Sequence, residues 1–187
     1  MSEKILTGNS STGAQALDSL TNPEGLRDRD DVTFTTETRR HDDVDHCGVD
    51  VAGQAIAGIE NDDSELLLLL NDELGVAVLP HASVERGDDW AAVARQGVEN
   101  QTGVSVTLDH IEAVRQVDHV VADAGKPHTT THRVLFAGRP AGGEIHDCKR
   151  AASAGSDDWR AGWFTDLPDA IEMPGDGPGD DLQHFLG

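Results

Sequence analysis

The segment from Leu79 to Val104, LPHASVERGDDWAAVARQGVENQTGV, carries the residue types best suited to chemistry. Its polar side chains include three carboxylates followed by two amides: Glu85, Asp88, Glu99, Asn100 and Gln101. Hard cations such as Mg²⁺ take charged oxygen ligands, which carboxylates supply and amides do not. The segment therefore has the outline of a metal-binding site in which only part of the charge is present.

The same segment predicts a helix from Asp88 to Gln101. Its apolar residues recur at helical spacing: Trp90, Val93, Ala94, Gly97 and Val98. The pair Thr102-Gly103 follows and is typical of a helix end. Trp90 could stack on a base, but its apolar helical position favours the core.

This segment resembles the Nudix box, G-x5-E-x7-R-E-U-x-E-E-x-G-U, where U is aliphatic. Without a gap, Ala82 takes the position of the first glycine and Asp88 that of the first glutamate. Val98, Gly103 and Val104 take the aliphatic, glycine and aliphatic positions. The frame of the motif is therefore kept.

The resemblance implies that the metal-binding glutamates are replaced. In the family they bind a divalent metal, usually Mg²⁺, which bridges a diphosphate so that water can cleave it. Here those positions hold Gly97, Asn100 and Gln101, and Gln96 replaces the arginine. Gly97 could be required for close packing. However, glycine inside a helix lowers stability by about 1 kcal/mol relative to alanine, so loss of catalysis is the preferred interpretation.

A frame shifted by one residue would place Arg95 and Glu99 on the arginine and a glutamate of the motif. That alignment puts Gly97 on the aliphatic position and needs gaps on both sides, so the ungapped frame is simpler. Glu99 then points about 100° around the helix from Asn100 and is predicted to be a solvated acid.

The resemblance spans residues 44–172, including HRVLFAG and GWFTDLPDAI, and implies an α/β/α sandwich with a central mixed sheet. We expect a single domain with flexible tails: a partly disordered N-terminal arm (1–43), the domain (44–172) and a C-terminal tail (173–187). The residues themselves predict strands at VTFTTETRR, GVDVAGQAIAGIE, ELLLLLND, GVAVLP, VSVTLDHIEAVRQVDHVVAD and TTTHRVLFAG. WRAGWFTDLPDAI predicts a strand, a turn and the start of a last helix.

The charge of the chain indicates the salt concentration of its solvent. The net charge is −21, with 35 acidic and 14 basic residues spread along the chain. At about 1 M salt the screening length falls to roughly 3 Å, which offsets the repulsion of such a surface. We therefore expect a protein of a halophilic organism. Direct nucleic-acid binding is not expected, because no cluster of Lys and Arg is present.

Other constellations carry weaker signals. His128 and His132 lie in a turn followed by a strand, where their spacing has no helical meaning. His46-Cys47 and His146-Asp147-Cys148 could meet as a metal site, but their spacing is not that of zinc ligands. No G-x-S-x-G elbow or phosphate loop occurs. The N-terminus lacks an apolar signal, and no run is long enough to span a bilayer, so we expect a cytoplasmic protein without membrane partners.

Three functions follow as hypotheses. The preferred one is a non-hydrolytic module that binds a nucleotide-like ligand or a protein partner, with Asn100, Gln101, Glu85 and Asp88 as ligand-binding candidates. The second is an active hydrolase of nucleoside diphosphate derivatives, using Mg²⁺ or Mn²⁺ and displaced carboxylates such as Asp88, Glu85, Glu99 or Glu112. The third is a structural subunit of a larger assembly.

Overall fold

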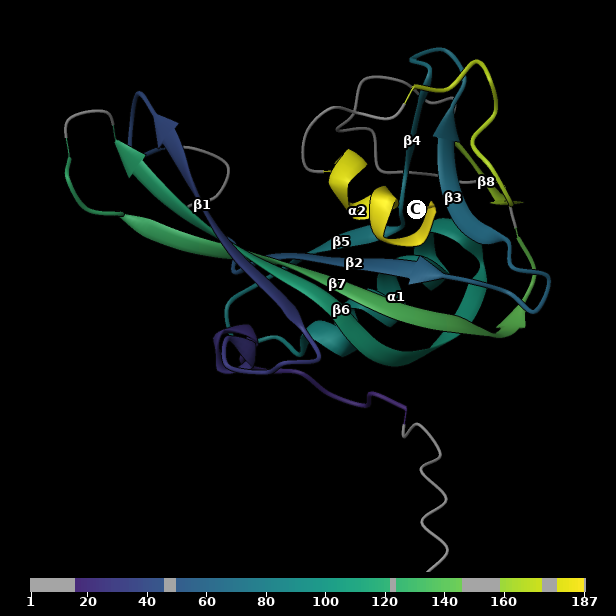
Figure 1. The fold of residues 1–187 in the computed structure, drawn as a ribbon, viewed down its shortest axis with the longest axis horizontal. Coiled ribbons are helices and arrows are strands. Elements are labelled where there is room, and N and C mark those ends of the chain that lie inside the picture. Colours follow the sequence, from purple (N-terminus) through teal and green to yellow (C-terminus); the bar gives the residue numbers. More distant parts are fainter. Residues whose placement is uncertain (1–15, 46–49, 122–123, 146–158, 173–177, 187) are drawn as a thin grey trace, which may run out of the picture.

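The computed structural model describes residues 16–45, 50–121, 124–145, 159–172 and 178–186. Its larger sheet contains five strands in the order β1-β6-β7-β2-β5, namely β1 (Thr33–His41), β6 (Val104–Val121), β7 (Thr129–Gly143), β2 (Gly53–Ile59) and β5 (His81–Val84). The pairs β1–β6 and β7–β2 are parallel and the others antiparallel. The expected α/β fold with a mixed central sheet is therefore confirmed (Figure 1).

A smaller antiparallel sheet packs beside the first, in the order β4 (Val76–Val78), β3 (Leu66–Asn71) and β8 (Trp159–Phe164). All six residues of β3 are buried. Leu67 belongs to one apolar cluster, whereas Leu66, Leu68 and Leu70 belong to another. The leucine run is thus the predicted strand buried on both faces.

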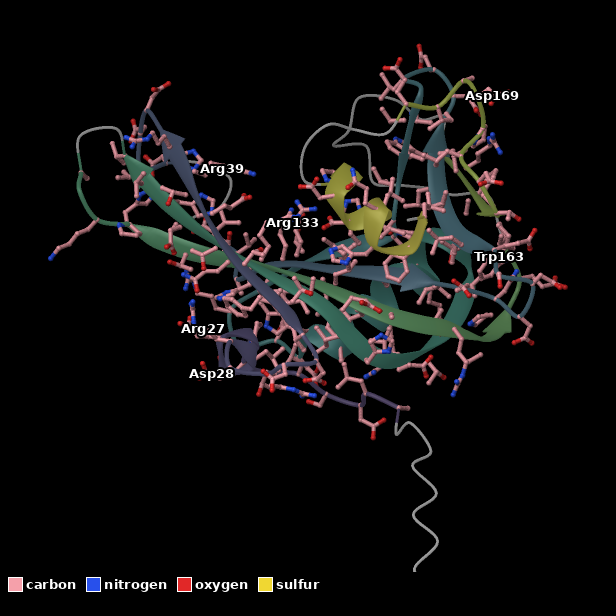
Figure 2. All side chains as sticks on the ribbon, viewed as in Figure 1. Arg27, Asp28, Arg39, Arg133, Trp163 and Asp169 are labelled. Carbon is pink, nitrogen blue, oxygen red and sulfur yellow. The ribbon has the colours of Figure 1, made fainter. Side chains whose placement is uncertain are left out.

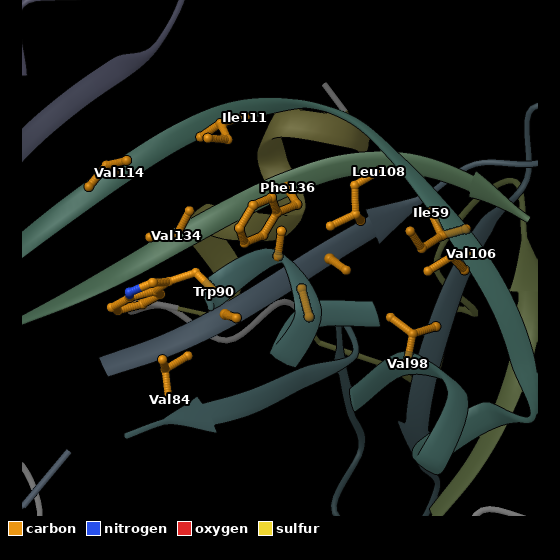
Figure 3. Close-up of a cluster of buried hydrophobic side chains, with 14 of the residues drawn as sticks. Ile59, Val84, Trp90, Val98, Val106, Leu108, Ile111, Val114, Val134 and Phe136 are labelled. Atoms are coloured by element: carbon orange, nitrogen blue, oxygen red, sulfur yellow. The ribbon is translucent and has the colours of Figure 1, made fainter. Parts of the chain in front are cut away.

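Helix α1 (Trp90–Thr102) covers one face of the larger sheet. Its Trp90 and Val98 point into a core formed with Val84, Val134 and Phe136 (Figure 3). The helix ends at Gly103, whose φ of 83° is a left-handed conformation that glycine adopts without strain. The predicted helix and its stop are both found, and Trp90 is a core residue, 3 % exposed.

The chain on the N-terminal side of residue 44 contributes to the sheet. A 3₁₀ turn (η1, Pro23–Leu26) buries Pro23 and Leu26, and β1 pairs with β6 along its whole length. The expected boundary at residue 44 between an N-terminal arm and the domain therefore cuts β1 off from the sheet to which it belongs. The strand predicted at VTFTTETRR is confirmed as β1, and its pairing with β6 fixes its place at the edge of the sheet.

The C-terminal residues form α2 (Pro178–Leu186) on the opposite face of the larger sheet (Figure 1). Leu182 is fully buried, and Phe185 and Leu186 pack against the same apolar cluster. These residues dock onto the domain and are not a frayed end. The expected helix after the turn at Asp166 is absent from described residues 165–172, and the last helix that the structure describes is α2.

No helix in the described ranges is both long and apolar enough to cross a bilayer.

Candidate functional site

The predicted site begins with a turn between β5 and α1. The Glu85 amide donates to Asp88 Oδ2 at 3.3 Å, and the Asp88 amide donates to the Glu85 carbonyl at 3.2 Å. Both residues are exposed. Asp88 therefore closes the turn through its side chain, and the next residue, Asp89, caps the helix.

Gly97 is buried where α1 crosses β5. A Cβ atom at this position would lie 2.8 Å from the Cβ of Ala82, closer than packed carbon atoms tolerate. In the Nudix pattern the small residue is at position 82 and the large one at position 97. Here position 82 has gained a methyl group and position 97 has lost its side chain, so close packing, the alternative to loss of catalysis, accounts for Gly97.

The side chain of Gln101 is tied to the backbone of β5. Its Nε2 donates to the carbonyl of His81 at 2.9 Å, and its Oε1 accepts from the amide of His81 at 3.1 Å. A glutamate could accept from the amide but would place a second negative oxygen against the carbonyl. The amide at this position is therefore used to join helix and strand.

The remaining candidates do not gather around a centre. Gln96, Glu99 and Asn100 are exposed on α1, as predicted for Glu99. Glu112 lies on β6 with its Oε1 2.6 Å from Nε2 of His110. Within the described residues no three His, Cys, Asp or Glu side chains are grouped so as to hold a metal. The donors at the motif positions therefore do not fit Mg²⁺, which prefers several charged oxygens.

Residues 16–20, which we call the strap, lie across the start of α1, a contact that the sequence does not predict. Arg95 donates to the carbonyls of Leu17 at 3.0 Å and Asp18 at 2.9 Å. Asp89 accepts from the Leu20 amide at 3.1 Å and from the Ser19 hydroxyl. Arg95, considered for the shifted motif frame, is thus occupied in holding the strap.

The Asp89 carboxylate also accepts from the first amides of α1, those of Ala91 at 3.0 Å and Ala92 at 3.2 Å. Partial burial opposes its ionisation, but the hydrogen bonds from Ser19, Leu20 and these amides together lower the pKa of Asp89 below its usual value. The ionised side chain therefore joins strap and helix.

A groove lies on the other face of the larger sheet, between the outer end of β1 and α2. It consists of two adjoining cavities of about 290 Å³ and about 180 Å³, which share Gln54 and Arg133 as lining residues. Figure 2 shows Arg39 and Arg133 in this region. Its polar lining also includes His41, His81, Ser83, His119, Thr131 and Asp181. No spacing along the chain predicts the groove, because its residues come from six strands and α2.

Arginine side chains gather beside this groove although the chain carries a net charge of −21. The register of β6 and β7 places Arg115 opposite Arg133. Arg133 donates to Asp181 Oδ2 at 2.6 Å, while Arg115 lies 3.4 Å from Asp180 Oδ2 and 3.9 Å from Asp181 Oδ1. Three arginines, Arg39 included, thus form a region of locally balanced charge on an acidic surface.

Two imidazoles and a hydroxyl form a hydrogen-bonded row at the β1 end of the groove. His41 Nε2 lies 2.8 Å from His119 Nδ1, and His119 Nε2 lies 2.8 Å from Thr131 Oγ1. The rings of His41 and His119 stack at 5.0 Å between centroids. His119 uses both of its ring nitrogens within the row and is buried, so it holds His41 and Thr131 in place at this end of the groove.

The remaining histidines and tryptophans have separate surroundings. His128 meets the ring of His41 edge-on, whereas His132 meets that of Trp90, so His128 and His132 form no pair. Burial lowers the pKa of His132, opposed by the charge of Glu24. Trp159 is buried, and Trp163 lines a third, open cavity. The possible metal ligands His46, Cys47, His146, Asp147 and Cys148 lie outside the described residues.

No protein-family model matches this chain, and no curated protein does. Solved structures similar to it include the mutator MutT protein of Bacillus halodurans, with 18 % identity over 59 % of this chain and 66 % of that one, at a TM-score of 0.45. An ADP-ribose pyrophosphatase of Streptococcus suis has 16 % identity over 71 % and 84 %, at 0.44. A Nudix hydrolase of Nitrosomonas europaea has 23 % identity over 62 % and 72 %, at 0.38. The activities in these names are those of the similar proteins.

Proposed function

We propose that this chain is a Nudix-type module that binds a nucleotide-like ligand without metal-dependent hydrolysis. The frame of the box supports the family assignment, because β5, the turn at Asp88, α1 and the stop at Gly103 follow one another without a gap. The loss of hydrolysis is supported by the use of two metal positions for structure: Gly97 packs on Ala82, and Gln101 holds the backbone of His81.

The groove between β1 and α2 is the observation that carries the binding proposal. A nucleotide combines anionic phosphates with a polar ring, and the groove combines arginines with the row of His41, His119 and Thr131. Arginine is suited to phosphate because its planar fork can donate two parallel hydrogen bonds. Each cavity alone is smaller than the roughly 300–1,000 Å³ of typical small-molecule pockets, so a nucleotide needs both of them.

The test is a calorimetric titration of the purified chain with ADP in molar KCl, with and without Mg²⁺ or Mn²⁺. Arg39 lines the groove and the adjacent Arg40 does not, although both are exposed arginines of β1. We expect Arg39→Gln to weaken ADP binding about tenfold, as for the loss of one charge-assisted hydrogen bond, and Arg40→Gln to leave it unchanged. Absence of ADP binding to the unaltered chain would overturn the proposal.

Hydrolysis is measured in the same preparation with a panel of dinucleotides and sugar nucleotides. We expect no metal-dependent turnover. Turnover that disappears on Glu99→Gln or Asp88→Asn would instead establish displaced carboxylate ligands and an active enzyme.

A further inference from the structure

Asp181 of α2 is buried against the arginines of the groove. The residue is 5 % exposed, and its Oδ2 accepts from Arg133 at 2.6 Å. Its Oδ1 lies 3.9 Å from Arg115 Nη1, too far for a hydrogen bond. One carboxylate is therefore shared between two guanidinium groups and satisfies only one of them closely.

The fork of Arg133 is half used. Its Nε is buried and has no hydrogen-bond partner among the described residues, while its Nη2 donates to Asp181. A buried donor without an acceptor costs roughly 1–3 kcal/mol. Because Asp181 reaches one N–H group of this fork, an acceptor that approaches from the cavity can still satisfy the other.

A phosphate group suits this arrangement better than the Asp181 carboxylate does. It carries more acceptor oxygens, so it can accept from both Nε and Nη2 of Arg133 while another oxygen faces Arg115. Arg133 also lines both cavities, and Asp181 and Pro178 of α2 line the smaller one. The position of the carboxylate is thus continuous with space that a ligand can enter.

We propose that Arg115 and Arg133 form a phosphate subsite, and that the carboxylate of Asp181 takes the place of the phosphate in this structure. The proposal rests on the proposed function of the groove, since it assigns the position of one phosphate of the ligand. Binding of that phosphate displaces the Asp181 carboxylate and shifts the first turn of α2, which also carries Asp180.

Helix α2 has features that allow such a shift. It is nine residues long, and isolated helices shorter than about 12 residues are marginal in water, so docking holds it in place. Its apolar contacts come from Leu182, Phe185 and Leu186, with the ring of Phe185 filling the space above Gly58. The first turn makes ion pairs through Asp180 and Asp181, and a phosphate competes for these contacts.

The test uses inorganic diphosphate and ADP, titrated into the full chain by calorimetry in molar KCl. We expect Asp181→Asn to tighten diphosphate binding about tenfold, because the arginines lose a competing charge but keep an acceptor. Asp72→Asn is the matched control: it removes one charge from an exposed pair with Arg160 at 2.7 Å outside the groove and should change nothing. Arg133→Lys keeps the charge without the fork and should weaken diphosphate binding about tenfold, whereas Arg160→Lys should not.

Hydrogen exchange of α2 in the unaltered chain gives a second readout, which does not depend on the folding of a variant. We expect saturating diphosphate to accelerate exchange of the amides of residues 181–186. Slower exchange would mean that the helix closes on the ligand and would overturn the proposal.

The outcomes separate the two proposals. If ADP binds and its affinity is unchanged by both Asp181→Asn and Arg133→Lys, the subsite is wrong and the binding function stands. If diphosphate binds as expected but ADP binds no more tightly, the subsite stands and recognition of a nucleotide is wrong. If neither probe binds to the unaltered chain or to Asp181→Asn, both proposals fail.

Discussion

At the scale of single residues, Ala82 and Gly97 show how a replaced position can be structurally required. The Cβ of Ala82 packs against Gly97. A Cβ atom added to Gly97 would lie only 2.8 Å from it. Restoring a side chain at residue 97 alone therefore cannot restore a metal ligand, because the strand beneath it has changed as well.

This close contact predicts that substitutions at the two positions have strongly coupled effects on stability. Gly97→Ala should lower the free energy of unfolding by about 1–3 kcal/mol, because overpacking outweighs the gain in helix propensity. The double variant Gly97→Ala with Ala82→Gly should recover most of that loss. Urea unfolding of the two single variants and the double variant completes the cycle, and additive effects would contradict the packing argument.

Gln101 makes the second residue-scale prediction. Gln101→Glu should lower the free energy of unfolding by about 1–3 kcal/mol near neutral pH, since the carboxylate faces the carbonyl of His81 without a proton to donate. Asn100→Asp places the same charge on the exposed neighbour and should be close to neutral. Thermal unfolding in molar KCl measures both, and equal stability of the two variants would rule out a structural role for the amide.

At the scale of elements, the strap and α1 stabilise each other through Asp89. The backbone amide of Trp90 donates to the carbonyl of Leu20 at 2.8 Å, and that of Leu17 to Leu108 at 2.7 Å. The strap therefore joins the first turn of α1 to β6. The strap is five residues long and lies in a stretch rich in Ser, Thr, Asn, Gly and Asp, so its local pattern predicts an arm and none of these contacts.

Asp89 is predicted to make this junction sensitive to acid. Its pKa is lowered in the folded chain, so its contribution is present above the pKa of the unfolded chain, about 3.9, and is lost as the pH falls through the lowered value. Asp89→Ala should cost about 1–2 kcal/mol at neutral pH, and the difference from the unaltered chain should shrink below about pH 4. Urea titrations at several pH values test this, with Asp88→Ala as the neighbouring control. A difference that does not change with pH would contradict it.

The sequence predicts an element well when neighbouring residues determine it, and poorly when a partner far along the chain does. The leucine run is a short apolar segment bounded by turns, and α1 follows from helical spacing and the stop at Gly103, so both predictions rest on local features and both are confirmed. The residues of β1 also predict a strand, but its place beside β6 and the docking of α2 on the cluster around Leu182 depend on partners elsewhere in the chain. The arginine groove depends on strand register, which places Arg115 against Arg133, and no spacing along the chain encodes it.

At the scale of the whole molecule, the net charge of −21 remains the property with the widest effect. Among the described residues, most ion pairs have at least one exposed partner and contribute little individually. The repulsion among the remaining carboxylates acts over distances that salt screens.

We predict that the unfolding temperature rises as KCl increases from about 0.1 M to about 1 M, because the screening length falls from about 10 Å to about 3 Å. The double variant Asp62→Asn with Asp63→Asn removes two exposed charges and should lessen this dependence. Calorimetric scans at a series of salt concentrations provide the measurement. An unfolding temperature that does not change with salt would contradict adaptation to salt.

The parallel pairing of β1 with β6 also bears on the order in which the molecule folds. Thr33 lies opposite Ala113, eighty residues later in the chain. Pairing the two strands therefore closes a long stretch of chain, and this costs conformational entropy before the pairing contributes any stability. During synthesis β1 leaves the ribosome long before its partner exists. We therefore expect β1 to be the last strand to join the larger sheet. Its Thr, Glu and Arg side chains suit a strand that stays in contact with solvent until β6 has formed.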